Sequence, residues 1–134
     1  MKSISKHCDG ANDLQIFTSM EAKYVIQIRN DIKEFLAANS GGYPLKNIVK
    51  FEGEEYEVRV FLSLDIENKN YYIEKPLEYF LEKTKGKIIP VGIDSGDNYY
   101  CVNNETGKVY YWTSGDNQYY CIANSLIEFN TPFE

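Results

Sequence analysis

The alternation of hydrophobic and polar positions first predicts an amphipathic helix over residues 18–39. Its apolar side chains recur every three or four positions, which leaves charged side chains for the opposite face. Thr18 and Glu21 have the spacing of a capping box at its start. Gly41, just beyond its end, suits a left-handed closing turn, because glycine has no Cβ to clash there. The predicted core face carries Tyr24, Ile28, Ile32, Phe35 and Leu36.

Two shorter stretches alternate with a period of two, which is the pattern of β-strands. They cover residues 47–51 and 55–63 and lie on either side of Gly53. A short glycine-containing link between two such stretches is typical of a β-hairpin, which we therefore predict here. One face of its second strand is apolar and consists of Tyr56, Val58, Val60 and Leu62.

A second helix and a further strand are predicted around two prolines. Pro76 suits the first position of a helix, because the N–H that proline lacks is unpaired there anyway, and we expect this helix to stop at Gly86. Residues 87–93 then have the composition of a strand. Pro90 within it cannot donate to a neighbouring strand, so the sequence predicts an edge strand or a bulge.

The last third of the chain contains the strongest pattern, a short sequence that occurs twice. Residues 95–102 return at 114–122 with one inserted residue, and the apolar stretch 108–112 lies between them. Turn-forming residues separate the three stretches, which predicts a three-strand antiparallel meander. The first and third strands of a meander run the same way, so we expect Asp97 and Asp116 to lie near one another at one end of the sheet.

A short helix is predicted to close the chain, with Ser125 and Glu128 at the spacing of a capping box. We expect it to bring three apolar side chains to the core, namely Leu126, Ile127 and Phe129. Together these elements predict an α+β fold, in which a mostly antiparallel or mixed sheet packs against helices. We expect a single domain over residues 18–134, preceded by an N-terminal tail, residues 1–17, with room for a short strand.

Charge narrows the classes of partner. The 134 residues carry fourteen Lys and Arg against twenty Asp and Glu, a net charge of -6, whereas binders of nucleic acid or anionic membranes need a basic surface. The acidity is concentrated in residues 94–134, where Lys108 is the only basic residue. The sequence therefore favours a basic protein partner over direct nucleic-acid or membrane binding.

The N-terminal residues indicate the cellular location, and the cysteines indicate whether a metal site or a disulfide is present. No apolar run has the length of a membrane span or the character of a signal peptide, so we expect a cytoplasmic protein. Cys8, Cys101 and Cys121 lack the spacing of a zinc site, and His7 is the only histidine. We predict reduced thiols, and we predict neither a metal nor a cofactor. Cys101 and Cys121 would lie two strands apart, too far for a disulfide.

Candidate catalytic chemistry is sparse. The sequence holds no nucleophile elbow, phosphate-binding loop or metalloprotease motif. Asp94 with Asp97 or Asp116 has the composition of a general acid and base pair, but aspartate in glycine-rich turns more simply forms local hydrogen bonds. Asp94, Asp97 and Asn98 offer oxygen ligands to calcium, although their spacing is not that of an EF-hand.

Tyrosine is unusually frequent, with twelve residues, six of them in three doublets of the meander. Neighbouring strand residues point to opposite faces, so each doublet offers one ring to each side of the sheet. We expect Tyr99, Tyr111 and Tyr119 to line one face, opposite a face packed on helices that contains Tyr100, Val102, Tyr120 and Ile122. The first face is either an interface or covered by the hairpin or loops. Trp112, the only tryptophan, is more simply interpreted as core or rim packing than as a ligand platform.

The order of these features resembles the SUKH superfamily, the Smi/Knr-like proteins named after yeast cell-wall regulators. The resemblance covers residues 20–130. Its first motif, at a helix end, is matched by Phe35, Leu36, Asn39, Gly41 and Gly42. Its second motif, an Ile-Pro pair followed by an acidic glycine turn, is matched by Ile89, Pro90, Asp94, Gly96, Asn98 and Tyr100.

The resemblance implies an α+β SUKH fold and, for bacterial members, a non-catalytic immunity protein. Such a protein binds a cognate toxin of a polymorphic or contact-dependent system, often a basic nuclease domain, and occludes its active site. The alternatives are a regulatory scaffold of the Smi/Knr type and, less favoured, a small carboxylate-dependent hydrolase. The tyrosine-rich strands are also compatible with self-association. The candidate partner-binding residues are Asp94, Asp97, Asn98, Tyr99, Glu105, Tyr111, Trp112, Asp116 and Tyr119.

Overall fold

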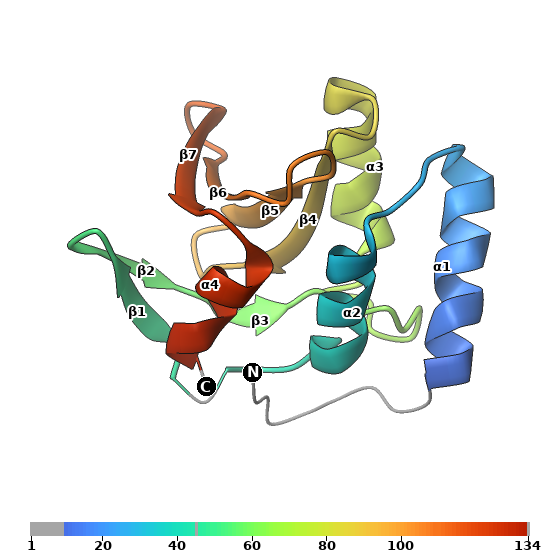
Figure 1. Cartoon of the computed structure of the whole chain (residues 1–134), viewed down its shortest axis with the longest axis horizontal. Coiled ribbons are helices and arrows are strands. Elements are labelled where there is room, and N and C mark those ends of the chain that lie inside the picture. The colour runs from blue at the N-terminus through green and yellow to red at the C-terminus, as the bar shows by residue number, and fades with distance from the viewer. Residues whose placement is uncertain (1–9, 45, 134) are drawn as a thin grey trace.

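The computed structural model describes residues 10–44 and 46–133. His7 and Cys8 lie outside the described residues. Within these residues the fold is α+β, as predicted, with helices packed on a five-stranded antiparallel sheet and a separate two-stranded sheet (Figure 1). The helices are α1 (Gly10–Tyr24), α2 (Asn30–Asn39), α3 (Glu74–Thr84), α4 (Leu126–Asn130) and the short 3-10 helix η1 (Thr131–Phe133). The strands are β1 (Ile48–Phe51), β2 (Glu54–Glu57), β3 (Val60–Phe61), β4 (Ile88–Ile93), β5 (Tyr99–Asn103), β6 (Val109–Thr113) and β7 (Gln118–Ala123).

The single helix expected over residues 18–39 is wrong, because the chain forms two helices there. Val25 has a φ of 55°, which ends α1, and α2 begins at Asn30. The carboxylate of Glu21 accepts a hydrogen bond of 2.8 Å from the backbone N–H of Ile28, in the link between the helices. Glu21 therefore supports the turn after α1 instead of capping a helix that starts at Thr18. Residues 10–17, expected in the tail, form the first half of α1.

The predicted hairpin is confirmed, although its second strand is shorter than expected. β1 and β2 pair in an antiparallel register that sets Ile48 opposite Glu57, and Gly53 takes the left-handed turn between them with a φ of 83°. The chain then leaves this sheet. Val60 and Phe61 pair with β4 instead and form one edge of the five-stranded sheet.

α3 and β4 show how the two prolines are accommodated. α3 begins at Glu74, two positions before Pro76, and ends where Lys85 adopts a left-handed φ of 58° just before Gly86. β4 lies between β3 and β5, so the edge-strand alternative for Pro90 is wrong. The register shifts between Pro90 and Gly92, which confirms the alternative of a bulge. A bulge suits proline because the residue lacks the N–H that a regular ladder would use.

The predicted meander is confirmed, since β5, β6 and β7 follow one another in the sheet and pair antiparallel. β7 forms the second edge of that sheet. After it, the hydroxyl of Ser125 accepts a hydrogen bond of 3.1 Å from the N–H of Glu128, as the capping box predicts. Leu126 and Phe129 are buried, but Ile127 is 81% exposed, so its expected place in the core is wrong.

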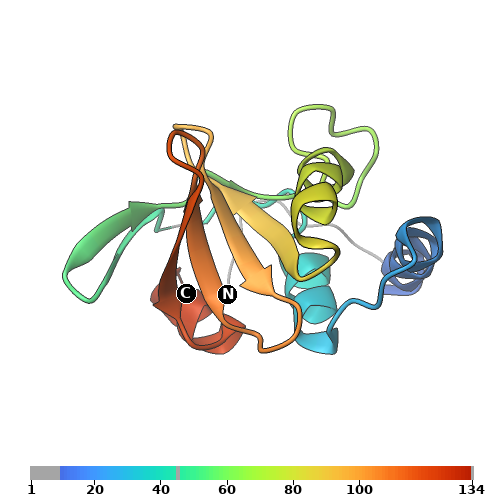
Figure 2. The same ribbon diagram turned by 90° about the horizontal axis from the view of Figure 1, so that it is seen from above.

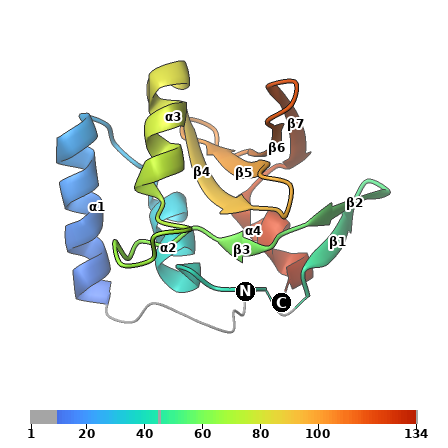
Figure 3. The same cartoon turned by 180° about the vertical axis from the view of Figure 1, so that it is seen from behind.

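Helices cover both faces of the five-stranded sheet (Figure 2). α2 and α4 pack on one face through Phe35 and Phe129, whose rings lie 6.2 Å apart, and Phe129 reaches the ring of Tyr100. α3 packs on the other face through Phe80, which contacts Cys101 and Trp112. Figures 1 and 3 place α1 and the β1–β2 hairpin at opposite ends of the molecule. The sheet between them holds the predicted site residues.

Candidate functional site

Two turns lie side by side at one end of the meander, and we call residues 94–98 and 114–117 the paired turns. The side-chain oxygen of Asn98 in the first turn accepts hydrogen bonds from the N–H of Ser114, at 2.9 Å, and from its hydroxyl, at 3.3 Å. This bridge confirms that the two Ser-Gly-Asp-Asn stretches meet at the same end of the sheet. Asp97 and Asp116 are exposed on the neighbouring turns.

Asp94 holds the first of the paired turns together from within. Its Oδ1 accepts hydrogen bonds from the N–H groups of Gly96 and Asn98, at 2.8 and 2.9 Å. Its Oδ2 accepts one from the hydroxyl of Tyr111 at 2.5 Å, and the residue is only 9% exposed. Burial, together with the hydrogen bond to Asp94, raises the pKa of Tyr111. Both carboxylate oxygens of Asp94 are therefore engaged in holding the turn.

Glu57, at the end of the hairpin, clamps the same turn from outside. Its two carboxylate oxygens accept hydrogen bonds from the N–H of Ser95, at 3.0 Å, and from the Ser95 hydroxyl, at 2.6 Å. Its backbone carbonyl accepts a third, of 2.5 Å, from the hydroxyl of Tyr100. Sequence reasoning missed Glu57, because its partner lies 38 positions away and no local motif connects them.

The register of the meander corrects the expected tyrosine faces. β6 pairs Tyr111 with Tyr100 of β5 and with Tyr120 of β7, and directly opposed residues share a face. Tyr111 therefore lies on the face covered by α2 and α4, and its expected place beside Tyr99 is wrong. Trp112 takes that place, opposite Tyr99 and Tyr119. Tyr120 stays 47% exposed although it lies on the helix-covered face, because β7 is an edge strand.

On the α3 side of the sheet, a cavity of about 370 Å³ opens beside the paired turns, and we call it the aromatic groove. Trp112 lines it, with its ring centroid 5.6 Å from that of Tyr79 and 6.0 Å from that of Tyr99. The Trp112 ring is fixed by a hydrogen bond of 2.7 Å from its Nε1 to the side-chain oxygen of Asn117. The groove is lined by Lys75, Pro76, Tyr79, Phe80, Asp97, Tyr99, Trp112 and Ser114.

On the opposite side of the sheet, a second cavity of about 490 Å³ lies between the hairpin and β6–β7, and we call it the acidic groove. The rings of Tyr56 and Tyr111 meet in it, with centroids 5.4 Å apart. Burial, and then the charges of Glu54 and Glu52, raise the pKa of Tyr56. The groove is lined by Glu54, Glu55, Tyr56, Glu57, Tyr111 and Tyr120.

Of the predicted site residues, Glu105 lies far from the paired turns and Tyr119 lies beside them on the edge strand. Glu105 is in the turn between β5 and β6, at the other end of the strands, where its carbonyl accepts a hydrogen bond of 2.8 Å from Arg29. The structure therefore does not bring Glu105 together with Asp97 and Asp116. Tyr119 is 37% exposed on the edge strand, and burial of the rest of its ring raises its pKa to about 12.

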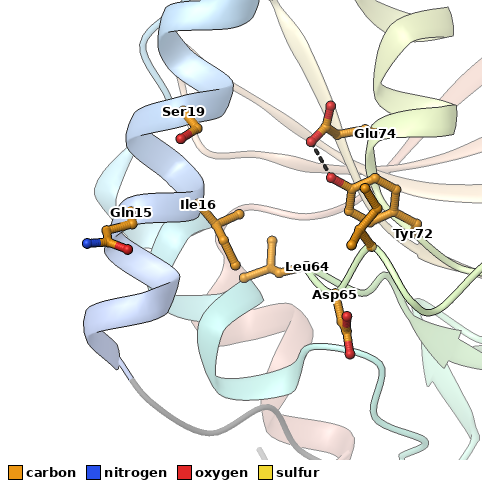
Figure 4. A pocket seen from close by; sticks show the side chains of 8 residues that line it. Gln15, Ile16, Ser19, Leu64, Asp65, Tyr72 and Glu74 are labelled. Carbon is orange, nitrogen blue, oxygen red and sulfur yellow. Dashed lines mark hydrogen bonds between the residues drawn. The ribbon is translucent and has the colours of Figure 1, made fainter.

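A third cavity, of about 490 Å³, lies between α1 and the segment before α3, and Figure 4 shows it. The Glu74 carboxylate in its wall accepts hydrogen bonds from Tyr72, from Tyr24 at 2.8 Å and from Lys23 at 2.9 Å. Burial works against the charge of Glu74, but these hydrogen bonds lower its pKa overall. Glu74 thus fixes α1 to α3. The cavity is lined by Gln15, Ile16, Ser19, Leu64, Asp65, Ile66, Tyr72 and Glu74.

The part of the chain that the structure describes contains two cysteines and several acidic side chains that could in principle bind a metal. No group of three or more histidine, cysteine, aspartate or glutamate side chains is arranged there to hold a metal ion. Cys101 and Cys121 are both free, the first buried and the second exposed, and burial raises the pKa of Cys101. Each helix among these residues is too short or too polar to cross a membrane.

Comparison with known proteins gives a family and a fold. The family model of the SMI1 / KNR4 family (SUKH-1) matches residues 11–130. No curated protein matches the sequence. A crystal structure of a protein from Pseudomonas syringae pv. tomato superposes with a TM-score of 0.59 and 16% sequence identity, over 98% of this chain and 86% of that one. At this identity the likeness shows a shared fold over nearly the whole chain.

Proposed function

We propose, from the premise that this chain belongs to the SMI1 / KNR4 family (SUKH-1), that it is a non-catalytic immunity protein. It binds a cognate toxin and occludes the active site of that toxin. The observation that supports this function is the arrangement at the paired turns, where exposed carboxylates surround two tyrosine-lined grooves. Partner binding is the use that this arrangement suits.

The charge of this end of the molecule selects the partner. Asp97 and Asp116 are exposed on the turns, and three glutamates of the hairpin line the acidic groove. Among the residues that the structure describes, Lys75 is the only basic one that lines either groove. A negative surface of this kind accelerates encounter with a positive one, so the partner is a basic protein, such as the catalytic domain of a nuclease toxin. An immunity protein of this type acts in the cytoplasm, where the toxin would reach nucleic acid.

The aromatic residues supply the lasting part of the affinity. Tyr79, Tyr119 and Tyr120 are between 37% and 47% exposed around the paired turns. Tyrosine is enriched at binding hot spots because its ring buries a large area at a small cost in side-chain entropy. Association would therefore be steered by the carboxylates and then held by ring contacts.

A regulatory scaffold is the second candidate, and the edge strand β7 favours it. The six residues Gln118–Ala123 include no charged residue and no proline, and four of them are exposed. Natural sheets commonly protect an exposed edge with charge or proline, because an unprotected edge can add a strand from another chain. A scaffold would use this edge to bind a partner strand or a second copy.

The test is co-expression of the chain with toxin domains encoded by adjacent genes. Cell survival and co-elution on gel filtration are the two readouts. We expect the double variant Asp97→Lys with Asp116→Lys to lose protection, because it reverses the charge of both turns without touching the core. Glu105→Lys is the control, to be compared with each single Asp→Lys variant, since it reverses one acidic charge at the far end of the strands. Full protection by the double variant would contradict docking at the paired turns.

A further inference from the structure

The aromatic groove combines ring surfaces with a single unpaired carboxylate, which is the composition of a site for an organic cation. We infer that this groove binds one arginine side chain of the partner, with the guanidinium against the rings of Tyr79 and Tyr99 and close to Asp97. The inference rests on the proposed function for the identity of the partner, but the groove itself can be tested without a toxin.

The rings form a rigid floor and two accessible walls. Trp112 is 6% exposed and Phe80 is fully buried, with ring centroids 5.1 Å apart, so the floor is fixed. Tyr79 is 39% exposed and Tyr99 is partly exposed, and both rings contact Trp112 and line the groove. The face of an aromatic ring carries negative charge density, which attracts a cation placed over it.

The rim of the groove offers polar atoms that have no partner within the chain. Asp97 is exposed, and its carboxylate makes no hydrogen bond or ion pair with the residues that the structure describes. The hydroxyls of Tyr79 and Tyr99 are likewise unpaired among those residues. Asp97 and Tyr99 line the groove together, and burial, followed by the charge of Asp97, raises the pKa of Tyr99. A cation in the groove would therefore meet one negative group and two hydroxyl acceptors.

The neighbouring lysines leave the groove open to a cation from outside. Lys75 lines the groove, but its ammonium group is directed to the carbonyl of Lys69, at 3.5 Å, and forms no ion pair with Asp97. Lys83 lies 5.8 Å from the centroid of the Tyr79 ring and does not line the groove.

Arginine fits this site better than the other side chains of a basic protein. Its planar guanidinium stacks on aromatic faces and forks its donors toward a carboxylate, whereas the compact ammonium of lysine stays more strongly hydrated. An apolar side chain would cover Asp97 without pairing it, which costs free energy, and a phosphate would be repelled by it.

The test uses N-acetyl-arginine amide as the probe and N-acetyl-citrulline amide as its neutral isostere. Trp112 is the only tryptophan of the chain, so its fluorescence reports on the groove, and backbone amide shifts of Asp97 and Tyr99 give a second readout. We expect saturable changes with the arginine probe and an apparent affinity at least about threefold lower with citrulline, since the charge supplies the cation–π and carboxylate contacts. Equal responses to both probes, or no saturable response in either readout, would overturn the inference.

Two variants locate the binding. Asp97→Asn should weaken the arginine probe by about three- to tenfold, and Tyr79→Leu should weaken it similarly by removing one ring face. Asp116→Asn is the matched control, because it neutralises an exposed carboxylate of the other turn, which does not line the groove. Equal weakening by Asp97→Asn and Asp116→Asn would indicate general electrostatic attraction and would overturn the assignment to this groove.

The same variants separate this inference from the proposed function. If the arginine probe binds in the groove but no toxin is neutralised, the groove assignment stands and the immunity function fails. If Asp97→Asn and Tyr79→Leu each bind and neutralise a toxin as well as the wild type does, the immunity function stands and the arginine site is wrong. In that second case the acidic groove becomes the docking surface to test.

Discussion

The hydroxyl of Tyr111 donates a hydrogen bond of 2.5 Å to Oδ2 of Asp94, which joins the middle strand of the meander to the first of the paired turns. The two residues lie 17 positions apart, and Asp94 uses its other oxygen for the N–H groups inside the turn. The exposed position of Asp97 therefore depends on a contact with the sheet. Stability of the fold and presentation of the proposed binding surface are coupled at this point.

Tyr111→Phe should test this coupling. The change removes one donor to a buried carboxylate, so we expect the free energy of unfolding to fall by about 1 to 2 kcal/mol, measured by urea denaturation. Tyr120→Phe is the control, because its hydroxyl is 3.4 Å from Asp116 at an exposed site, and it should cost less than about 0.5 kcal/mol. If both variants unfold at the urea concentration of the wild type, the contacts within the turn hold Asp94 without Tyr111.

The meander shows what local sequence could predict. Its turns and strands are encoded by contiguous residues, and the Ser-Gly-Asp-Asn repeat was enough to place both turns at one end. The faces of the rings were harder, because they depend on which residue of β6 stands opposite Tyr100. That register follows from the conformation of the turn between β5 and β6, and a shift of one residue exchanges the two faces. The expected face of Tyr111 is therefore wrong, whereas the expected packing role of Trp112 is confirmed by its burial.

The other differences between the predicted and the observed structure come from contacts between residues that are distant in the sequence. No glycine marks the end of α1 at Val25, and the link to α2 is supported by a side chain of α1 itself, Glu21. Glu57 reaches the first paired turn, and Glu74 ties α1 to α3, only because the folded sheet and helices bring them there. Periodicity within one segment carries no information about such pairs.

Glu74 predicts a pH dependence with a definite sign. Its pKa is lower in the folded chain than the ordinary value of 4.5, because Tyr72, Lys23 and Tyr24 stabilise its charge against the effect of burial. Such a group stabilises the fold above its unfolded-state pKa, and the contribution is lost as the pH falls through the folded-state pKa. In urea denaturation the wild type should therefore exceed Glu74→Gln in stability at pH 7, and this difference should close as the pH falls below about 4.5.

The control for Glu74 is Glu82→Gln, an exposed glutamate on the same helix. We expect this variant to follow the pH dependence of the wild type. A difference between wild type and Glu74→Gln that stays constant down to pH 3 would show that the hydrogen bonds do not depend on the charge of Glu74.

The two described cysteines should differ in reactivity. Cys121 is exposed on the edge strand, whereas Cys101 is buried against α3 and its thiol pKa is raised by that burial. Because the thiolate is the reactive form, a disulfide reagent such as DTNB should modify Cys121 rapidly in the native protein and reach Cys101 only after unfolding. The measurement is best made in a Cys8→Ser background. A fast phase that persists in Cys121→Ser would contradict the burial of Cys101.

Two glycines with the same backbone angle separate strain from crowding. Gly107 and Gly53 both have a φ of 83°, so an alanine at either position suffers the same left-handed strain, about 1 kcal/mol. At Gly53 the new Cβ would meet nothing within 4 Å, whereas at Gly107 it would lie 2.9 Å from the guanidinium of Arg29. Arg29 cannot move freely, because it donates to Asp31 at 3.0 Å and to the Glu105 carbonyl at 2.8 Å.

Gly107→Ala should therefore destabilise the chain more than Gly53→Ala, by about 1 kcal/mol for the hydrogen bonds of Arg29 that must be rearranged. The two variants are compared by urea denaturation at equal ionic strength. Arg29→Ala combined with Gly107→Ala completes a double-mutant cycle, in which the cost of the alanine at position 107 should fall toward that at position 53, with the contact to Asp31 at 3.3 Å remaining. If Gly107→Ala costs no more than Gly53→Ala in the wild-type background, Arg29 moves aside freely and its contacts with Asp31 and Glu105 do not fix this end of the meander.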